Sequence, residues 1–479
     1  MAKVITNKES LALPYLMATL KDAYDRLLFP AIEREIRTSL FDDAAEGALK
    51  VFSENLRNLL LVSPIKGKTV LGYDPGYGHG CKLAVVDKTG KVLDTEVIYP
   101  FRQKGNPSER DISISRQKVL GLIKRNNVDI VAIGNGTASR ESEKFIAETI
   151  RDASCPKGVK YTIVSEAGAS VYSASKLATE EFPDFDVMQR SAISIARRLQ
   201  DPLAELVKIE PKAIGVGQYQ HDMKQNRLTD ALGGVVEDCV NGVGVDLNTA
   251  SYSLLSYVSG INSTAAKNIV AYREANGEFK SRKQLLKVPK IGDKAFLQCA
   301  GFLRIPGGRI VLDNTGVHPE SYAIAEDLLR RFGFTTQDVG TANLALLKFK
   351  AEQYGTAKLA KELGCGEPTL LDIIGELEKP GRDIRDDAPA PILSTDVLEI
   401  TDLKPGMQLK GTVRNVIDFG CFVDIGVHHD GLLHISEMSD KFVKRPSDLF
   451  SVGDVIEVLV KDVDLRKNRI ALTRKGLGK

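Results

Sequence analysis

The sequence predicts a multi-domain α+β protein, and three observations lead to this class. Between Lys68 and Glu166, three short apolar strands joined by glycine turns precede an alternation of helix, strand, helix and strand. After Ser251, a unit of short helix, tight turn and second helix occurs twice, offset by 30 residues. Five short strands end the chain. These patterns favour a mixed α/β sheet flanked by helices, a helical section and a small five-stranded OB barrel.

Composition restricts the classes of function. The 479 residues suffice for about three domains of roughly 150 residues each, and 43% hydrophobic with 27% charged residues is typical of a folded protein. The net charge of +2 excludes a histone-like polycation. Any nucleic acid would therefore have to bind at local basic patches, with an affinity that depends on salt.

Neither the cysteines nor the apolar segments indicate an oxidising compartment or a membrane. The six cysteines include no CxxC pair, which argues against a zinc site or redox motif and favours reduced thiols. No apolar run reaches the roughly 18 residues of a membrane span. The first residues faintly resemble a signal peptide, but Pro14 interrupts the apolar part and no small-x-small cleavage site follows. We expect a cytoplasmic protein with no membrane partner.

The chain is expected to divide into seven segments. The first is a helical arm, with helices beginning near Tyr15, at Pro30 and near Asp43, which has little apolar surface of its own and is expected to pack on the neighbouring domain. The expected segments are 1–66 for the arm, 67–210 for the mixed α/β domain, 211–250 for a connecting segment, 251–310 for the paired helical hairpins, 311–378 for a helical domain, 379–400 for a proline- and charge-rich linker, and 401–475 for the barrel.

The barrel carries the strongest binding signal. Phe419 and Phe422 flank a glycine turn, and His434 lies on the next strand. Rings on the outer face of an OB sheet stack on unpaired bases, and nearby cations meet phosphates. The cations in question are Lys410, Arg414, Lys441, Lys444 and Arg445. The alternative is that both phenylalanines are core residues and that His434 merely fills a strand. The string from Lys404 to Lys475 resembles the S1-type OB-fold throughout, and this resemblance implies binding of single-stranded RNA.

The repeated turn is the second binding signal. Backbone N–H groups at a tight turn that leads into a helix form a nest for a phosphate. The two turns resemble tandem helix-hairpin-helix motifs, which grip nucleic-acid backbones without reading sequence, and whose turns usually place two glycines around one apolar residue. They are Gly260-Ile261-Asn262 and Lys290-Ile291-Gly292. Because asparagine tolerates the left-handed conformation, we expect the first turn to be intact. Lys290 adds charge but bars close approach, so we expect the second only to pack. A plain helical bundle is the alternative.

The stretch VLGYDPG places Asp74 at a strand end. The α/β section resembles the YqgF/RuvC branch of the RNase H-like fold, whose nucleases hold two metal ions with carboxylates at strand ends and on a closing helix. By position, Asp74 fits the first carboxylate and Glu166 the second, whereas Asn135 stands where some relatives carry an acid. Asp-Pro-Gly is also a good turn sequence, so Asp74 has a purely structural alternative.

The closing helix offers Asp186, but only by a loose match, and Asp184 and Asp186 are also well placed to cap that helix. Two carboxylates hold two metal ions poorly. We therefore expect a degenerate site with Asp74, Glu166 and Asp186 as vestigial candidates, no cofactor and no bound metal; Mg²⁺ or Mn²⁺ would enter only if the chain were a nuclease.

The order of these parts resembles one family in particular, the bacterial Tex family of transcription accessory proteins. DAYDRLLFPAIEREIR, EAGASVYSAS, GVGQYQHD and DNTGVHPESY are phrases of that family, and the resemblance covers nearly all of the chain from about Asp22. Members carry a sizeable N-terminal helical region before this point, so the chain is expected to be either a natural short form or a truncated one. The resemblance implies nucleic-acid binding and a role in transcription, without established catalysis.

Three hypotheses arise from these patterns. The first is an RNA-binding accessory factor, with DNA as a further ligand, that acts as a non-catalytic platform. The second is a metal-dependent, structure-selective nuclease, which a third carboxylate near Asp74 and Glu166 would favour. The third is a scaffold that docks RNA polymerase or the ribosome, which exposed apolar side chains between Glu320 and Glu378 would favour.

Overall fold

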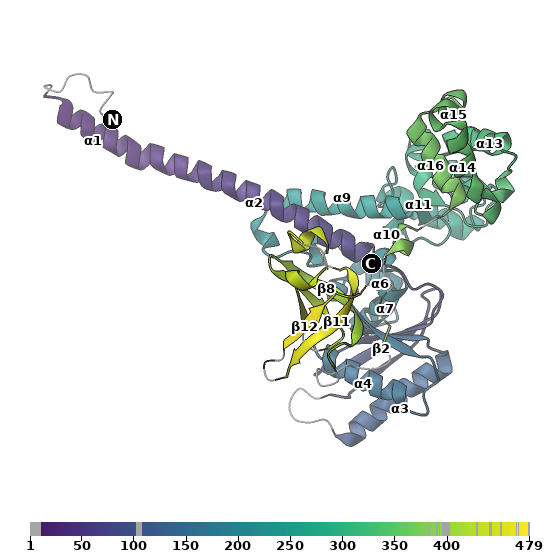
Figure 1. Ribbon diagram of the computed structural model, residues 1–479, viewed down its shortest axis with the longest axis horizontal. Coiled ribbons are helices and arrows are strands. Elements are labelled where there is room, and N and C mark those ends of the chain that lie inside the picture. The colour runs from purple at the N-terminus through teal and green to yellow at the C-terminus, as the bar shows by residue number, and fades with distance from the viewer. Residues whose placement is uncertain are drawn as a thin grey trace.

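Figure 1 shows the computed structural model of the chain, in which a long helical arm projects from a body of several packed units. The structure describes residues 11–477 apart from 102–107, 382, 389–390, 392, 395–402, 428–429, 440–442, 451–452, 466 and 468. None of the helices within these residues has the length and apolar character needed to cross a bilayer.

The arm is one nearly continuous helix, not the three helices that we expected. It consists of α1 (Leu13–Ala23), a π-helical turn (Tyr24–Leu28) and α2 (Phe29–Leu60). Pro30 lies in the first turn of α2, directly after the π-helical turn. Proline lacks a backbone donor and pushes away the carbonyl four residues earlier, and a single wide turn accommodates both effects without ending the helix.

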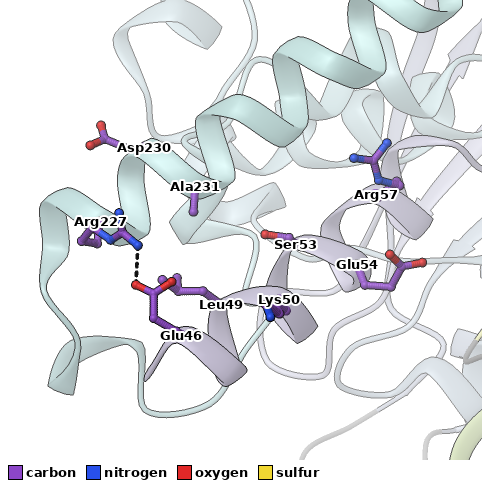
Figure 2. A pocket seen from close by; sticks show the side chains of 9 residues that line it. All are labelled: Glu46, Leu49, Lys50, Ser53, Glu54, Arg57, Arg227, Asp230 and Ala231. Carbon is purple, nitrogen blue, oxygen red and sulfur yellow. Dashed lines mark hydrogen bonds and ion pairs between the residues drawn. The ribbon is translucent and has the colours of Figure 1, made fainter. Parts of the chain in front are cut away.

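The C-terminal half of the arm packs on the body, as expected. Leu49, Phe52, Leu56 and Leu60 are buried against α9 (Gln225–Val243) and its neighbours. The groove between α2 and α9 is shown in Figure 2, where Arg227 forms an ion pair with Glu46. The side chains that line the groove are Glu46, Leu49, Lys50, Ser53, Glu54, Arg57, Arg227, Asp230 and Ala231. Because three acids and three bases face this groove, it has no preference for an anionic ligand.

The α/β unit contains a five-stranded mixed sheet in the order β3-β2-β1-β4-β5. Strands β1 (Val70–Asp74), β2 (Cys81–Val86) and β3 (Val92–Ile98) form the expected antiparallel meander. Strands β4 (Ile130–Gly134) and β5 (Lys160–Val164) continue the sheet in parallel to β1.

Helices cover both faces of this sheet. On one face lie α3 (Glu109–Asn126) and α4 (Ser139–Arg151), and on the other lies α7 (Val187–Gln200). Side-chain alternation along β1 explains the two cores, because Leu71 and Tyr73 face the first pair of helices whereas Val70 faces α7. The short helices α5 (Ala169–Ser173), α6 (Lys176–Glu181) and α8 (Pro202–Leu206) complete the unit.

The paired hairpins come after α9. They consist of α10 (Tyr252–Leu255), α11 (Ser263–Asn276), a 3-10 helix (Arg282–Lys287) and α12 (Asp293–Cys299), beside the two-stranded sheet of β6 (Val245–Asp246) and β7 (Leu303–Arg304). The next section has its own core and contains α13 (Tyr322–Arg331), α14 (Leu347–Tyr354), α15 (Thr356–Glu362) and α16 (Glu367–Glu378).

The described part of the proline-rich segment is tied to the body. Arg385 is buried, donates to both Asp383 carboxylate oxygens, and reaches Asp201 Oδ1 at 2.7 Å. Further on, Ser394 and Tyr161 exchange two backbone hydrogen bonds of 2.9 Å at the β5 edge of the sheet. The segment therefore passes along the α/β unit before it enters the barrel.

The five terminal strands form a closed barrel, as the sequence predicts. They are β8 (Gln408–Ile417), β9 (Gly420–Asp424), β10 (Gly431–His434), β11 (Val455–Asp464) and β12 (Arg469–Thr473), in the spatial order β10-β12-β11-β8-β9. Alternate residues fill a core that includes Val413, Val423, Leu433, Val458 and Leu472. The outward-facing residues of β8, β9 and β10 are the ones that concern function.

Candidate nucleic-acid interface

The outer face of β9 and β10 is set by strand alternation. Because Cys421 and Leu433 are fully buried in the barrel core, their neighbours point outward. The register pairs Leu432 with Phe422 and His434 with Gly420. Phe422 is half-buried and His434 is exposed, so both predicted residues lie on one face and neither fills the barrel core.

Phe419 occupies the turn before β9, and its side chain is 52% exposed. The Ile435 N–H donates to the Phe419 carbonyl at 2.9 Å, which holds the turn against the end of β10. A Cβ at Gly420 would lie 2.6 Å from the Leu433 carbonyl oxygen, so only glycine lets the turn approach β10 this closely. The glycine therefore places the Phe419 ring beside the outer face.

The predicted cations differ in their surroundings. Arg414 donates to the Asp424 carboxylate, and Lys410 Nζ lies 3.8 Å from Glu457 Oε1. Lys444 and Arg445 are exposed, whereas Lys441 lies outside the described residues. A phosphate at Arg414 or Lys410 must therefore compete with a carboxylate of the barrel itself.

Sequence reasoning missed two residues at the centre of this face. Leu432 lies opposite Phe422 on one side and Asn415 lies opposite it on the other. The alternation in GLLHIS, read outward from His434, would have identified Leu432. Asn415 follows a register shift in β8, which no periodicity in the sequence reveals.

The two hairpin turns have similar backbones, and the left-handed residue of the first turn is not the asparagine that we expected to permit it. Gly260 has φ +84° and Lys290 has φ +69°, so the left-handed residue is the first of each turn. Asn262 instead has φ −84° and caps α11 by accepting from the Ala265 N–H at 2.9 Å. Ile261 and Ile291 are each 5% exposed and anchor their turns. Lys290 therefore keeps the turn geometry although it lacks the glycine.

The hairpin segment is strongly basic, and a count of charged residues in the sequence identifies it as a candidate for phosphate contact. Residues 251–310 contain ten lysines and arginines against three acids, a net charge of +7. Residues 401–475 contain twelve against eleven, a net charge of +1. The whole chain has a net charge of only +2. Of the two predicted binding regions, the hairpin segment therefore carries much the larger net positive charge.

Asp74 and Glu166 lie near each other in the folded chain. Asp74 ends β1 and Glu166 follows β5, and parallel pairing through β4 brings both to the same edge of the sheet. Burial raises the pKa of Asp74, while a hydrogen bond from Ser191 and the charge of Lys82 act in the opposite direction. Burial also raises the pKa of Glu166, and the nearby Asp74 carboxylate raises it further.

The closing helix does not supply a third carboxylate at this point. The residue of α7 that reaches Asp74 is Ser191. Asp186 caps α7 in a capping box with Gln189, which agrees with its structural interpretation. Asn135 accepts a hydrogen bond from the Glu166 N–H at 3.0 Å and so positions the loop.

Two buried cations accompany the two carboxylates. Lys82 is 5% exposed and donates to the Gly80 carbonyl at 2.8 Å, and its charge acts on Asp74. Arg198 is 3% exposed and acts on Glu166. The buried Glu205 also acts on Arg198, more strongly than Glu166 does, so the two cations do not simply cancel the two carboxylates. In the part of the chain that the structure describes, no cluster of three potential metal ligands occurs. The residues present therefore do not fit a two-metal site.

Four family models match successive parts of the chain. The Tex protein YqgF-like domain matches residues 68–200, and a helix-hairpin-helix motif matches residues 240–304. An HHH domain matches residues 310–385, and the S1 RNA binding domain matches residues 402–475.

Curated relatives match almost the whole chain. YdcI of Bacillus subtilis is 54% identical over 471 residues, which is 98% of this chain and 64% of that protein. Transcriptional accessory protein Tex of Neisseria gonorrhoeae is 50% identical over 96% of this chain and 59% of its own length. YhgF of Escherichia coli is 49% identical over 93% of this chain and 56% of its own length. The chain thus spans somewhat more than half of the length of these relatives. The order of the four matched domains and this level of identity place the chain in the Tex family.

Proposed function

We propose that the chain is a nucleic-acid-binding transcription accessory factor that acts as a non-catalytic platform. Its barrel would bind single-stranded RNA by stacking unpaired bases, and its hairpin unit would hold a nucleic-acid backbone. The match to the S1 RNA binding domain supports the first activity, and the helix-hairpin-helix match supports the second. The transcription role rests on the name of the Neisseria gonorrhoeae relative, transcriptional accessory protein Tex.

The observation that carries this proposal is the outer face of the barrel. Phe419 in the turn and His434 on β10 are exposed, and the half-buried Phe422 and Leu432 lie opposite each other on the adjoining strands. Bases stack on such rings irrespective of their identity, at about 1–3 kcal/mol per base. The surface therefore suits unpaired bases with little sequence preference.

The absence of catalysis is proposed on the composition of the carboxylate site. A pair of metal ions needs a surplus of negative charge, whereas Asp74 and Glu166 are two buried carboxylates with raised pKa values on which the charges of Lys82 and Arg198 also act. We interpret the RNase H-like fold here as a scaffold that orients the other units.

One sample tests both parts of the proposal. Labelled single-stranded RNA, duplex DNA and a four-way junction are incubated with the protein and Mg²⁺ or Mn²⁺, then divided between a native and a denaturing gel. We expect shifted but intact strands, with binding that weakens as salt rises. Cleavage that disappears in Asp74→Asn would show that the chain is a nuclease and not a platform. Binding that is insensitive to salt would refute the proposed phosphate contacts.

A second function, docking of a protein, is favoured by one observation. The helical section exposes four large hydrophobic residues, Leu346 at 58%, Phe349 at 56%, Leu371 at 43% and Tyr354 at 36%. Purified RNA polymerase and ribosomes are the partners to test, by surface plasmon resonance against the wild type and a Leu346→Ser, Phe349→Ser variant. Binding that this variant loses would support docking through this section, and equal binding would exclude it.

A further inference from the structure

The loop of residues 215–224 leads into α9 and is fixed against α2, which lies beside that helix (Figure 1). The Asn55 side chain of α2 donates to the Val216 carbonyl at 2.9 Å. A Cβ at Gly217 would lie 2.2 Å from the Phe52 ring, so only glycine lets the loop approach α2 this closely. The arm therefore sets the position of the loop.

Hydrogen bonds from two glutamine side chains fix the next turn of the loop. Gln220 Nε2 donates to the Gly217 carbonyl at 2.9 Å. Gln225 Nε2 donates to the Gln220 carbonyl at 2.8 Å and to the Met223 carbonyl at 3.1 Å. The residue held at the apex of this turn is Tyr219, directly before a short 3-10 helix (Gln220–Asp222). A ring on such a support loses little conformational freedom when a ligand binds.

Tyr219 has an unfavourable backbone conformation and an exposed ring. Its φ of +57° and ψ of +28° lie in the left-handed region, which a bulky residue rarely adopts and which glycine adopts freely. The residue is 71% exposed, so packing of the ring does not compensate. Strained backbone of this kind is concentrated at functional sites. Neither packing nor backbone preference explains a tyrosine at this position, whereas a ligand of the ring would.

The surroundings of the ring select the class of ligand. Between Met188 and Leu286, all of which the structure describes, Tyr219 is the only large hydrophobic residue that is exposed. A protein interface would surround such a ring with an apolar core. A base needs only the face of the ring and polar groups around its edge. The exposed neighbours are polar, namely Gln218, His221, Asp222, Lys224, Gln225 and Asn226.

His221 supplies a second ring at the same place. Its centroid lies 6.4 Å from that of Tyr219, and the two planes are inclined by 50°. The rings therefore do not stack on each other, and their faces are left for a ligand. The barrel shows the same combination, with Phe419 and His434 both exposed at adjoining positions of its outer face.

The charges around the loop do not favour phosphate contact. Lys224 Nζ lies 2.9 Å from Asp42 Oδ1, and Arg227 pairs with Glu46. A phosphate at either cation would have to displace a carboxylate. Stacking is thus the main interaction that the loop offers.

We propose that Tyr219, with His221 beside it, is a second base-stacking site, and that its ligand is an unpaired base of a single-stranded nucleic acid. This inference rests on the proposed function, to which it adds a site outside the barrel and the paired hairpins. The rigid loop would hold a flipped-out or unpaired base by its face, without regard to its identity.

The test compares Tyr219→Gly and Tyr219→Phe in the full chain, by fluorescence anisotropy with a labelled single-stranded RNA of mixed sequence over a salt series. We expect Tyr219→Gly to weaken binding by about five- to hundredfold with an unchanged slope of log K against log salt, because a stack and no phosphate contact is lost. Tyr219→Phe keeps the stacking face and should bind like the wild type. Tyr15→Ala is the matched control, since Tyr15 is 78% exposed on the arm, and it should also bind normally.

Wild-type affinity in Tyr219→Gly would overturn the base site and leave a protein as the ligand of the ring. A smaller salt slope in that variant would also overturn it, in favour of phosphate contact. Thermal unfolding separates binding from folding: glycine is favoured at this backbone angle, so Tyr219→Gly should unfold at a higher temperature than the wild type. A lower temperature would show that the ring serves the fold instead. A wild-type chain that binds no RNA would refute the proposed function itself, whereas the outcomes above concern the second site alone.

Discussion

The barrel and the hairpin unit differ in the two properties that decide how a protein holds nucleic acid. The barrel exposes the Phe419 and His434 rings, but its charges nearly cancel, and Arg414 is occupied by Asp424. The hairpin unit exposes no such ring but carries a net charge of +7 over residues 251–310. We therefore propose that stacking and phosphate contact belong to separate regions, so that each can be removed without the other.

The largest expected effect is on the barrel. Phe419→Ala with Phe422→Ala should weaken binding of single-stranded RNA by roughly five- to hundredfold per stacked ring, because each base–ring stack contributes about 1–3 kcal/mol. Anisotropy with a labelled RNA measures this. Phe349→Ala is the matched control, since that ring is 56% exposed but belongs to the helical section. Unchanged affinity in the double variant would defeat the stacking argument.

The next effect concerns the packing of the two hairpins. Gly260→Ala should destabilise the unit by about 2 kcal/mol, because alanine is strained at φ +84° and its Cβ would meet Gln298. Amide hydrogen exchange over the unit reports this locally. Gly307→Ala is the control, since φ is +70° there but no atom lies within 4 Å of an added Cβ. Equal losses in the two variants would mean that the contact with α12 contributes nothing.

A smaller effect, on the stability of the fold, is expected at the carboxylate site. The pKa of Asp74 is raised in the folded protein, so its contribution to stability is complete below the ordinary carboxyl range and is lost as pH rises through the folded pKa. Asp74→Asn should therefore raise the free energy of unfolding at pH 7.5, on the order of 1 kcal/mol, and leave it unchanged near pH 3. Thermal unfolding at both pH values measures the difference.

Asp87 is a control in which the pKa shift has the opposite direction to that of Asp74. Burial opposes the shift, but hydrogen bonds from Thr89 and Lys91 hold the pKa of Asp87 below its usual value. Its stabilisation is present at neutral pH and lost as pH falls through the folded pKa, so Asp87→Asn should destabilise at pH 7.5. A loss of stability in Asp74→Asn at that pH would indicate that the charged carboxylate is needed there.

The smallest expected effect concerns the charge that the barrel offers to RNA. Asp424→Asn releases Arg414 from its carboxylate partner, and exposed ion pairs of this kind contribute about 0.2–1 kcal/mol. We expect affinity for single-stranded RNA to rise by up to about fivefold, with a steeper dependence on salt. If affinity falls instead, Asp424 itself serves the binding surface.

Much of the fold and of the binding face could be predicted from the sequence, because the strongest signals were local. Alternation around Phe422 and His434 is a period-2 pattern that a strand must place on one face. The 30-residue repeat likewise located Gly260 and Lys290. The arm was predicted less well: Pro30 was interpreted as a helix start, whereas a π-helical turn lets the helix continue.

The features that could not be predicted depend on contacts between distant segments. The placement of the Lys82 and Arg198 charges near the carboxylates arises from tertiary packing, and so does the approach of Ser191 to Asp74. The role of Gly260 against Gln298 is of the same kind, since it needs the two hairpins folded together. The charge of residues 251–310 required only counting, and it favours contact with phosphates in this segment.

The most direct test of the division between the two regions is one crossed titration. Single-stranded RNA and a duplex of the same sequence are each titrated with the wild type, with the Phe419→Ala, Phe422→Ala variant and with Lys290→Gln. We predict that the ring variant loses the single strand and keeps the duplex, and that the lysine variant does the reverse. Parallel losses of both ligands in both variants would mean that the barrel and the hairpin unit form a single binding surface.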